Sequence, residues 1–437
     1  MTTPDAFLQA LRAGEGTLQA DFNALCDLGG RLQGTPSADA AFDFVGEALL
    51  GVGAGQLSSP RTAYHGWTLE KVAISLPGMA AEIPCASLVG SVPTLPEGVE
   101  LEVVDLGRGT PEEIAAASGR VRGRAVLLRH EYAFATGTVH RRVKLRAAAE
   151  AGAAAVVMVQ PFEGYGPVSG GANLCPVPGF GVGIEGARRM LEAGRAQFLL
   201  RAHHHPAETV NHVLDIPGAG PGRVVLSAHL DGHPLAESAL DNATGVAALL
   251  GLARAAAPLA GGLPRGLTVC VFGAEEWSLS GSRAWLAGLP RAEVEAMAMN
   301  LNLDSIAGSS NLTALTSGYP ALGDFVRGAA AAAGHELSVH LPVSVSSDHA
   351  NFAHHGVPAM RLIAGFNEPE SRLARLLTAA DTRDAVHPDE LARATEIAGA
   401  ILWKALTVRD EDMAALRESR PDLSGPMAAL SPLPGVS

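Results

Sequence analysis

The sequence predicts an α/β protein with a mostly parallel central sheet flanked by helices, and with a β-rich domain inserted into it. Two observations support this fold class. After residue 211, short apolar runs alternate with helical stretches, which is typical of buried parallel strands and the helices that connect them. Between residues 70 and 205, short β-type runs broken by Gly and Pro predominate, and helices are few.

Length and composition limit the class of protein. The chain has 437 residues, which is room for two or three domains at roughly 150 residues each. Apolar residues make up 47% and charged residues 18%, as in a compact globular protein. A net charge of −13 is repelled by nucleic-acid phosphates and by anionic membranes. We therefore expect no nucleic-acid partner and no membrane partner, and the sequence gives no indication of the number of subunits.

The cysteines and the N-terminal stretch indicate the compartment. Cys26, Cys85, Cys175 and Cys270 lie far apart without a C-x-x-C pair, so neither a zinc ribbon nor a dense disulfide framework is expected. The first residues lack the basic start and apolar run of a secretory signal, and no apolar stretch approaches the roughly 18 residues that a membrane span needs. We therefore expect a cytoplasmic protein.

We divide the chain into four segments, which are a helical part, a β-rich insert, an α/β domain and a Pro-rich tail, at residues 1–65, 70–205, 206–410 and 411–437. In the first segment, Thr35 can cap a helix whose first residue is Pro36, and apolar residues follow at helical spacing. The insert is expected to hold one main helix, at 143–151, and strands near 72–76, 101–106, 125–128, 154–159 and 198–202. The α/β domain is expected to hold a helix after Asp241 and strands near 224–227, 267–272, 296–303 and 359–363.

Acids and histidines gather directly after these α/β strands or at the start of the next helix. There are six of them: His229, Asp231, Asp241, Glu275, Glu276 and Asp304. The carboxyl ends of parallel strands meet at one edge of a sheet, and imidazole with carboxylates is a donor set that binds zinc. Each residue alone has an ordinary explanation: Asp241, for example, stands where a helix cap belongs. Together they favour a site.

These residues lie in motifs that resemble the co-catalytic di-zinc aminopeptidase family, whose relatives include glutamate carboxypeptidase, the glutaminyl cyclases and the transferrin-receptor ectodomain. The motifs follow the family's order through nearly all of residues 205–410: AHLDGH, LDNATG, GAEEWSLSGS, NLDSIAG and SSDHANFAHHGVPA. The stretch GGRLQGTPSADAAFDFV resembles the family's opening helix, and the region from VRGRAVLL to GAAAVVMV resembles a protease-associated domain. The resemblance implies a zinc exopeptidase-like fold in which residues 1–65 and 206–410 form the metallopeptidase catalytic domain.

The resemblance also implies a role for each site residue. His229 and Asp304 would bind one zinc ion, Glu276 would bind a second, and Asp241 would bridge the two. Glu275 would be the general base, which takes a proton from the attacking water and passes it to the departing amine.

Asp231, two residues after His229, would orient the imidazole of that histidine.

One ligand of the family is missing. The stretch RLLTAADTRDAV has Leu377 where the resemblance leads us to expect the last zinc-binding histidine. Because leucine cannot bind zinc, the second ion would be one ligand short of the usual three plus water. His349 is the first candidate to replace it or to contact substrate, and His233 is the second. The run 203–205 of three histidines is interpreted as a solvated linker.

The sequence therefore predicts a metal-dependent exopeptidase with one or two zinc ions and a peptide substrate, and an aminopeptidase acting on short peptides is the first choice. Carboxypeptidase action stays open. Leu377 keeps a second hypothesis open, a catalytically degenerate family member that acts as a binding or scaffold protein. A glutaminyl cyclase-type transferase is a third, and it fits least because its one zinc would need the missing histidine.

Overall fold

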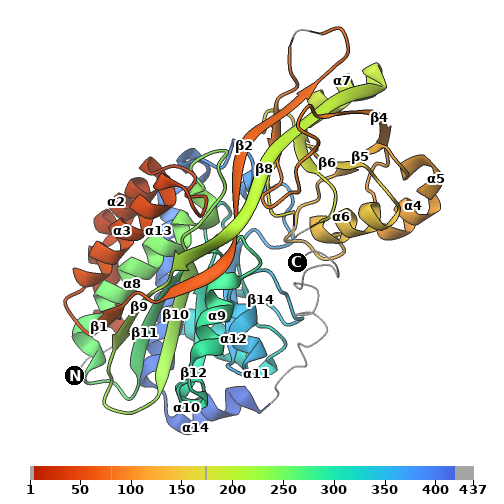
Figure 1. Cartoon of the computed structure of the whole chain (residues 1–437). Helices are drawn as coiled ribbons and strands as arrows, with labels where there is room; N and C mark the ends of the chain where they lie inside the picture. Colours follow the sequence, from red (N-terminus) through yellow and green to blue (C-terminus); the bar gives the residue numbers. More distant parts are fainter. Residues whose placement is uncertain (1–3, 80, 173–174, 419–437) are drawn as a thin grey trace.

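The computed structural model of the chain describes residues 4–79, 81–172 and 175–418. Its strands form two sheets, and two long strands run from one sheet to the other (Figure 1). Helices accompany both sheets, so the predicted α/β class is confirmed.

The first sheet has eight strands and a parallel centre. In spatial order they are β1 (Gln56–Ser58), β9 (His212–Ile216), β11 (Gly266–Phe272), β10 (Arg223–His229), β12 (Met297–Leu303), β15 (Ala359–Ala364), β13 (Leu312–Leu315) and β14 (Ser338–His340). The four central strands, β11, β10, β12 and β15, are parallel to one another. Antiparallel pairs flank them, β9 with β11 and β13 with β15. All four strands predicted from apolar runs in this domain are confirmed, and they are these central strands.

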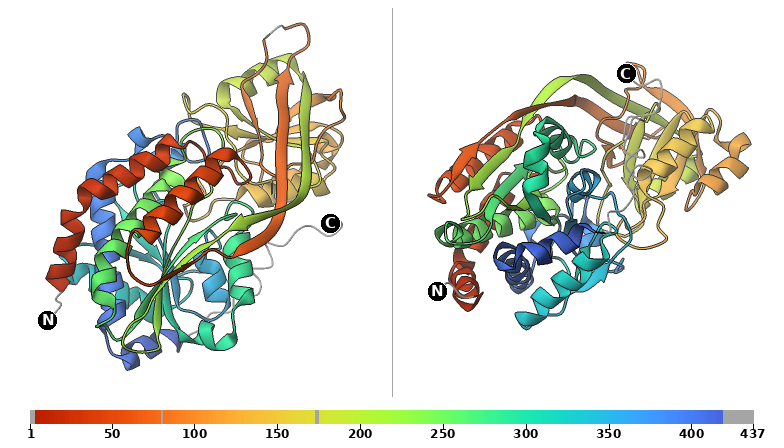
Figure 2. Two further views of the ribbon diagram at one scale, coloured as in Figure 1. Left: turned by 60° about the vertical axis from the view of Figure 1, so that its left-hand side comes forward. Right: turned by 90° about the horizontal axis from the view of Figure 1, so that it is seen from below.

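Helices cover both faces of this sheet (Figure 2). The long helices α8 (Thr244–Ala260) and α13 (Pro388–Thr407) pack on one face. On the other face, α9 (Ser280–Gly288) and α12 (His349–His354) meet through an aromatic cluster in which Trp285 and Phe352 contact Phe272 of β11. The remaining helices of this part are α1 (Pro4–Ala13), α2 (Glu15–Asp27), α3 (Pro36–Leu50), α10 (Arg291–Ala296), α11 (Pro320–Ala332) and α14 (Asp410–Ala414).

Two of these helices can be compared with sequence-based expectations. Helix α3 begins as predicted, since the Thr35 side chain accepts a hydrogen bond from the backbone N–H of Ala38. The stretch 239–260, which includes α8, is long and apolar enough to cross a membrane, but 72% of its most apolar window is buried inside the protein. Its apolar side chains therefore form part of the hydrophobic core.

The second sheet has seven strands, and its layers follow from the alternation of side chains. In spatial order the strands are β2 (Arg61–Ser75), β8 (Arg195–Val210), β4 (Val99–Asp105), β5 (Ala125–Arg129), β6 (Ala155–Gln160), β7 (Gly179–Gly183) and β3 (Cys85–Ser87). Leu127 of β5 is buried in the cluster that contains α7 (Ile184–Ala193), whereas its neighbour Val126 is buried with α4 (Pro111–Ala116) and α6 (Arg141–Glu150). Helices therefore cover both faces here too.

The strands β2 and β8 form the antiparallel ribbon that connects the sheets (Figure 1). The boundaries expected near residues 65–70 and 205–206 fall inside these two strands. Residues 203–205, interpreted as a solvated linker, are exposed or half-buried and lie in this connecting ribbon, but they form part of a strand: they belong to β8 and pair with Gly66, Trp67 and Thr68 of β2. Of the expected tail, the structure describes 411–418, which include the end of α14 and a short 3-10 turn, and the rest lies outside the described residues.

Candidate active site

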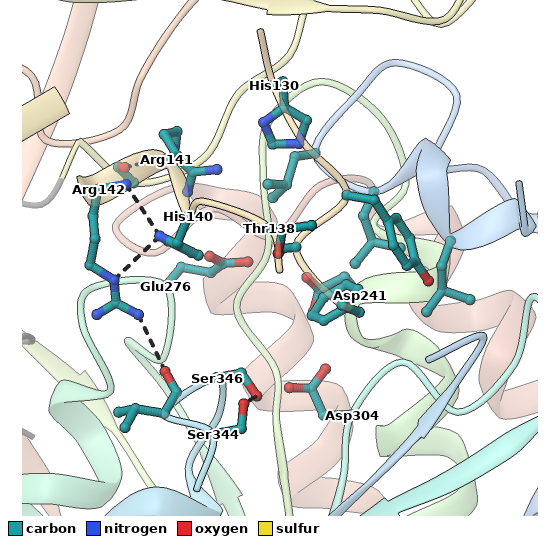
Figure 3. A pocket seen from close by; sticks show the side chains of 18 of the residues that line it. His130, Thr138, His140, Arg141, Arg142, Asp241, Glu276, Asp304, Ser344 and Ser346 are labelled. Carbon is teal, nitrogen blue, oxygen red and sulfur yellow. Dashed lines mark hydrogen bonds between the residues drawn. The ribbon is translucent and has the colours of Figure 1, made fainter. Parts of the chain in front are cut away.

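A cavity of about 500 Å³ opens at the carboxyl ends of the central strands. Five of the six predicted site residues line it, namely His229, Asp241, Glu275, Glu276 and Asp304. Figure 3 shows Asp241, Glu276 and Asp304 around this space, with His130, Thr138, His140, Arg141 and Arg142 beside them. The predicted convergence of the donors on one edge of the sheet is therefore what the structure has.

His229 ends β10 and is buried, with two carboxylates beside one ring nitrogen. Its Nε2 lies 3.1 Å from Asp241 Oδ1 and 3.5 Å from Asp304 Oδ1. Its Nδ1 lies 3.0 Å from the backbone oxygen of Asp231, which can only accept, so Nδ1 carries the proton of the neutral ring. The Nε2 lone pair then faces two anions, an arrangement that is favourable only with a proton or a metal cation between them.

Asp241 and Asp304 reach this point from two different elements. Asp241 lies in the irregular turn Ala239–Ala243 before α8, and the backbone N–H of its neighbour Leu240 donates to Asp381 Oδ1 at 2.7 Å. Asp304 follows β12, and its Oδ1 lies 3.0 Å from Nη2 of Arg361. Burial raises the pKa of Asp304, but Arg361 and His229 together hold it well below its usual value. Asp304 is therefore an anion in the site.

Asp231 holds the turn that carries the two glutamates. Its carboxylate accepts from the backbone N–H of Glu275 at 3.0 Å and from that of Glu276 at 3.1 Å. The expected contact between this carboxylate and His229 is 3.9 Å long, so the backbone oxygen of Asp231, rather than its side chain, makes the hydrogen bond that orients the imidazole. This corrects the predicted role of Asp231.

Glu275 and Glu276 point to different partners. A carboxylate oxygen of Glu275 and the donor atoms of His229 and Asp304 all lie within 4.8 Å of one another. Burial, with further contributions from Glu276 and Asp348, raises the pKa of Glu275 well above its usual value. The Oε2 atom of Glu276 lies instead 2.8 Å from Nε2 of His233. The adjacent acids therefore serve two halves of one site.

The two candidate replacement histidines are both buried, and neither is among the residues that line the cavity. His349 lies at the start of α12. Its expected role as a replacement ligand or substrate contact stays a prediction. His233, the second candidate, lies beside Glu276, and Leu377 lines the cavity wall.

Several site residues come from a segment that the sequence analysis did not select. His130, His140, Arg141 and Arg142 surround the start of α6 in the second sheet's domain. Arg142 donates to the backbone oxygen of Val345 at 3.3 Å, so the two domains meet across the cavity (Figure 3). The sequence feature that could have indicated these cavity residues is the pair Arg141–Arg142, which follows a Gly-containing loop.

Arg361 is not a surface charge, and it is among the residues that line the cavity. It is buried on β15 and paired with Asp304.

Comparisons with known proteins identify the domain. Residues 211–402 match the model of peptidase family M28. These residues form a domain of that family. Aminopeptidase YwaD of Bacillus subtilis is 25% identical over 331 residues, which are 72% of this chain and 69% of that protein. Leupeptin-inactivating enzyme 1 of Streptomyces exfoliatus is 29% identical over 156 residues, 36% of each protein.

Solved structures share the fold over nearly the whole chain. A zinc aminopeptidase from Bacillus subtilis has a TM-score of 0.73 and 21% identity, covering 90% of this chain and 96% of its own. A peptidase M28 precursor from Shewanella amazonensis has a TM-score of 0.75 and 17% identity, covering 93% and 98%. The predicted metallopeptidase class is thus confirmed at the level of the family.

Proposed function

We propose that this M28 protein is a zinc-dependent aminopeptidase that removes residues from the amino end of short peptides. The observation that carries the proposal is the placement of Glu275 against His229 and Asp304, with all three donor atoms within 4.8 Å of one another in a cavity. An acid beside a metal-binding donor set is the arrangement that hydrolysis by activated water requires.

The residues present fit zinc. The Nε2 lone pair of His229 faces the carboxylates of Asp241 and Asp304, and Asp241 Oδ1 is buried without a hydrogen bond of acceptable geometry. These three side chains would hold one ion, and Glu276 with Asp241 would hold a second. When bound, zinc supplies a Lewis acid that polarises the scissile carbonyl and lowers the pKa of water.

The protein's own groups perform the proton transfers. Glu275 accepts the proton of the attacking water and later delivers it to the amine that leaves. The carboxylate of Asp231 fixes the backbone of the Glu275–Glu276 turn, and so would hold Glu275 in place beside the metal-binding donors. No side-chain nucleophile is needed.

The substrate assignment rests on two supports. The cavity of about 500 Å³ holds a peptide of a few residues rather than a folded domain. The relatives include proteins named aminopeptidases, and their action on the amino end is what we propose for this chain.

The test compares wild type with Glu275→Gln on aminoacyl fluorogenic amides, with zinc content measured in both. We expect the variant to bind zinc like wild type and to lose about 100-fold to 10,000-fold in kcat, because only the proton acceptor is removed. Glu293→Gln, an exposed glutamate of α10, is the matched control and should be fully active. Amino-terminal acetylation of the substrate should abolish cleavage.

Two outcomes would reject this function. Cleavage of acetylated peptides from the carboxyl end would replace aminopeptidase by carboxypeptidase action. Zinc binding without turnover on any peptide would support the degenerate scaffold protein that Leu377 suggests.

A further inference from the structure

The second half of the site lacks a neutral donor at the position where relatives are expected to have one. Leu377 lines the cavity but offers no ligand atom. Glu276 and the shared Asp241 would leave the second ion with two protein ligands, and a stable zinc site uses three or more. Either this ion is not held, or another side chain supplies the third donor.

His233 lies beside Glu276, one of these two ligands. Its imidazole is buried, with 4% of the residue exposed, and its Nε2 lies 2.8 Å from Glu276 Oε2. Ser169 places it next to Leu377. The backbone N–H of Ser169 donates to the Leu377 oxygen at 2.7 Å, and its hydroxyl lies 3.4 Å from His233 Nδ1. A histidine from the loop after β10 is therefore linked through Ser169 to the backbone of Leu377, and it contacts Glu276, which lines the cavity.

The contact between His233 and Glu276 has the form of two ligands rather than of a simple hydrogen bond. The two atoms are close, but Nε2 of His233 is a buried atom without a hydrogen bond of acceptable angle, so its bonding direction does not aim at the carboxylate oxygen. Ligands of one ion aim at the ion and not at each other. Nε2 and a carboxylate oxygen on one tetrahedral zinc lie about 3.4 Å apart, so binding would separate this pair by only a few tenths of an ångström.

The tautomer of His233 agrees with a ligand role. The Ser169 hydroxyl donates to the backbone oxygen of Ser87, which leaves its lone pairs for Nδ1–H of His233. Nε2 then carries a lone pair beside Glu276, as Nε2 of His229 does beside Asp241 and Asp304. Both histidines thus present the same nitrogen to an acidic neighbour while the other nitrogen is held from behind.

The backbone of His233 is fixed by its surroundings. Its N–H donates to the Ser238 hydroxyl at 3.0 Å, and a side chain at Gly30 would come within 2.0 Å of its carbonyl oxygen. Arg31 is buried and donates to five backbone oxygens, three of them in the same loop, those of Leu230, Glu237 and Ser238. A ligand held this way loses little entropy on binding.

We propose that His233 is the third protein ligand of the second zinc ion, with Glu276 and Asp241, and that it replaces the histidine absent at position 377. This inference rests on the proposed function, because it assumes that the first three donors hold the first ion.

The test counts zinc rather than turnover. Full-length protein is stripped with chelator and titrated with Zn²⁺ against a chromophoric competitor. We expect two ions per wild-type chain. His233→Asn should keep one tight ion and bind the second at least about 100-fold more weakly, since losing even an outer partner of a ligand costs 10-fold to 100-fold. His349→Asn is the matched control and should keep both. Circular dichroism checks folding, and His233→Gln is the alternative if the asparagine variant does not fold.

A rescue variant locates the site. Leu377 has φ of 64°, a left-handed conformation that histidine adopts more readily than leucine. His233→Asn with Leu377→His should therefore bind two ions again, and the d–d absorption of the Co²⁺-loaded form should return with the second ion.

Three results would overturn the proposal: unchanged binding of both ions by His233→Asn, loss of the second ion in His349→Asn alone, or one ion in wild type. The first of these leaves the proposed function intact if wild type cleaves peptides. A wild-type protein that binds no zinc would refute the proposed function as well.

Discussion

Asp231 shows how a single side chain can serve the chemistry without touching substrate. Both of its carboxylate oxygens are occupied by the backbone N–H groups of the two glutamates. The family resemblance implied that Asp231 orients the imidazole of His229, and only one residue lies between the two. Sequence spacing cannot show which of two neighbours a buried carboxylate will satisfy. Here the carboxylate accepts hydrogen bonds from two backbone N–H groups, which need a partner when they are buried.

Asp231→Asn is the prediction at this scale. The amide has one acceptor oxygen, so its NH₂ group would face one of the two backbone N–H groups and the turn would have to shift. We expect a loss of about 1 to 3 kcal/mol in the free energy of unfolding. We expect kcat to fall by roughly 10-fold to 100-fold, because Glu275 is displaced. Urea unfolding and steady-state kinetics measure these effects. Asp215→Asn on β9, outside the cavity, is the control, and equal losses in both variants would contradict the prediction.

Five of the six site residues were predictable because each follows an apolar strand, and strand ends of a parallel sheet meet. The sixth, Asp241, precedes the next helix. His233 was a candidate ligand, but its partnership with Glu276 was not predictable. It depends on the path of the loop 230–241, which Arg31 sets from a segment about 200 residues earlier in the chain. Such a contact leaves no periodic signal in the sequence.

At the scale of elements, prediction succeeded where strands are buried on both faces and failed where they are not. The central strands are continuous apolar runs, and each was found. Only four residues of β2 and five of β8 were expected, although these strands have 15 and 16 residues. The missed halves, such as HHHPAETV, are exposed and polar and pair with each other in a ribbon. In such a ribbon, residues of the covered face alternate with exposed residues along each strand. The sequence therefore has no continuous apolar run there from which a strand could be predicted.

Helix α6 provides an element-scale prediction, because its Lys144 is fully buried. Its Nζ donates to the backbone oxygens of Arg108 and Arg129 and to Glu131 Oε1, at 2.6, 2.8 and 2.8 Å. Burial alone raises the pKa of Glu131, but hydrogen bonds from Arg108, Lys144 and the Val139 backbone lower it to about 2. Glu131→Gln leaves the buried ammonium without its counter-charge. We expect a loss of about 2 to 4 kcal/mol at pH 7.

The pH dependence of this loss follows from the depressed pKa. The carboxyl contributes its stability above its unfolded value of 4.5, and this contribution is lost as the pH falls from there through about 2. The difference between wild type and Glu131→Gln should therefore shrink in urea titrations as the pH is lowered from 5 toward 2. Glu100→Gln, whose partner Arg195 is half exposed, should cost less than about 1 kcal/mol at any pH. A constant difference for Glu131→Gln would contradict the ion pair.

At the scale of the whole molecule, the two domains share one cavity. The loop before α6 crosses to the M28 domain, where Tyr132 donates to the Gly365 oxygen at 2.8 Å and the Thr136 N–H donates to Asn367 Oδ1 at 2.8 Å. The sequence indicated an insert but not its position over the site, because nothing in its composition encodes that docking. Its resemblance to a protease-associated domain and the cytoplasmic location stay predictions.

This docking predicts selection by substrate length. With the loop in place, we expect kcat/KM to be highest for peptides of a few residues and to fall for longer ones, because the cavity of about 500 Å³ is bounded by both domains. Tyr132→Phe combined with Asn367→Ala removes the four hydrogen bonds that these two side chains make between the loop and the M28 domain. The variant should raise KM for tripeptides by roughly 10-fold, as positioning contacts are lost, and raise the ratio of dodecapeptide to tripeptide cleavage. Thr110→Ala, which removes the cap of α4 far from this contact, is the control and should keep the wild-type ratio. A length preference that is the same in both variants would show that the M28 domain alone selects the substrate.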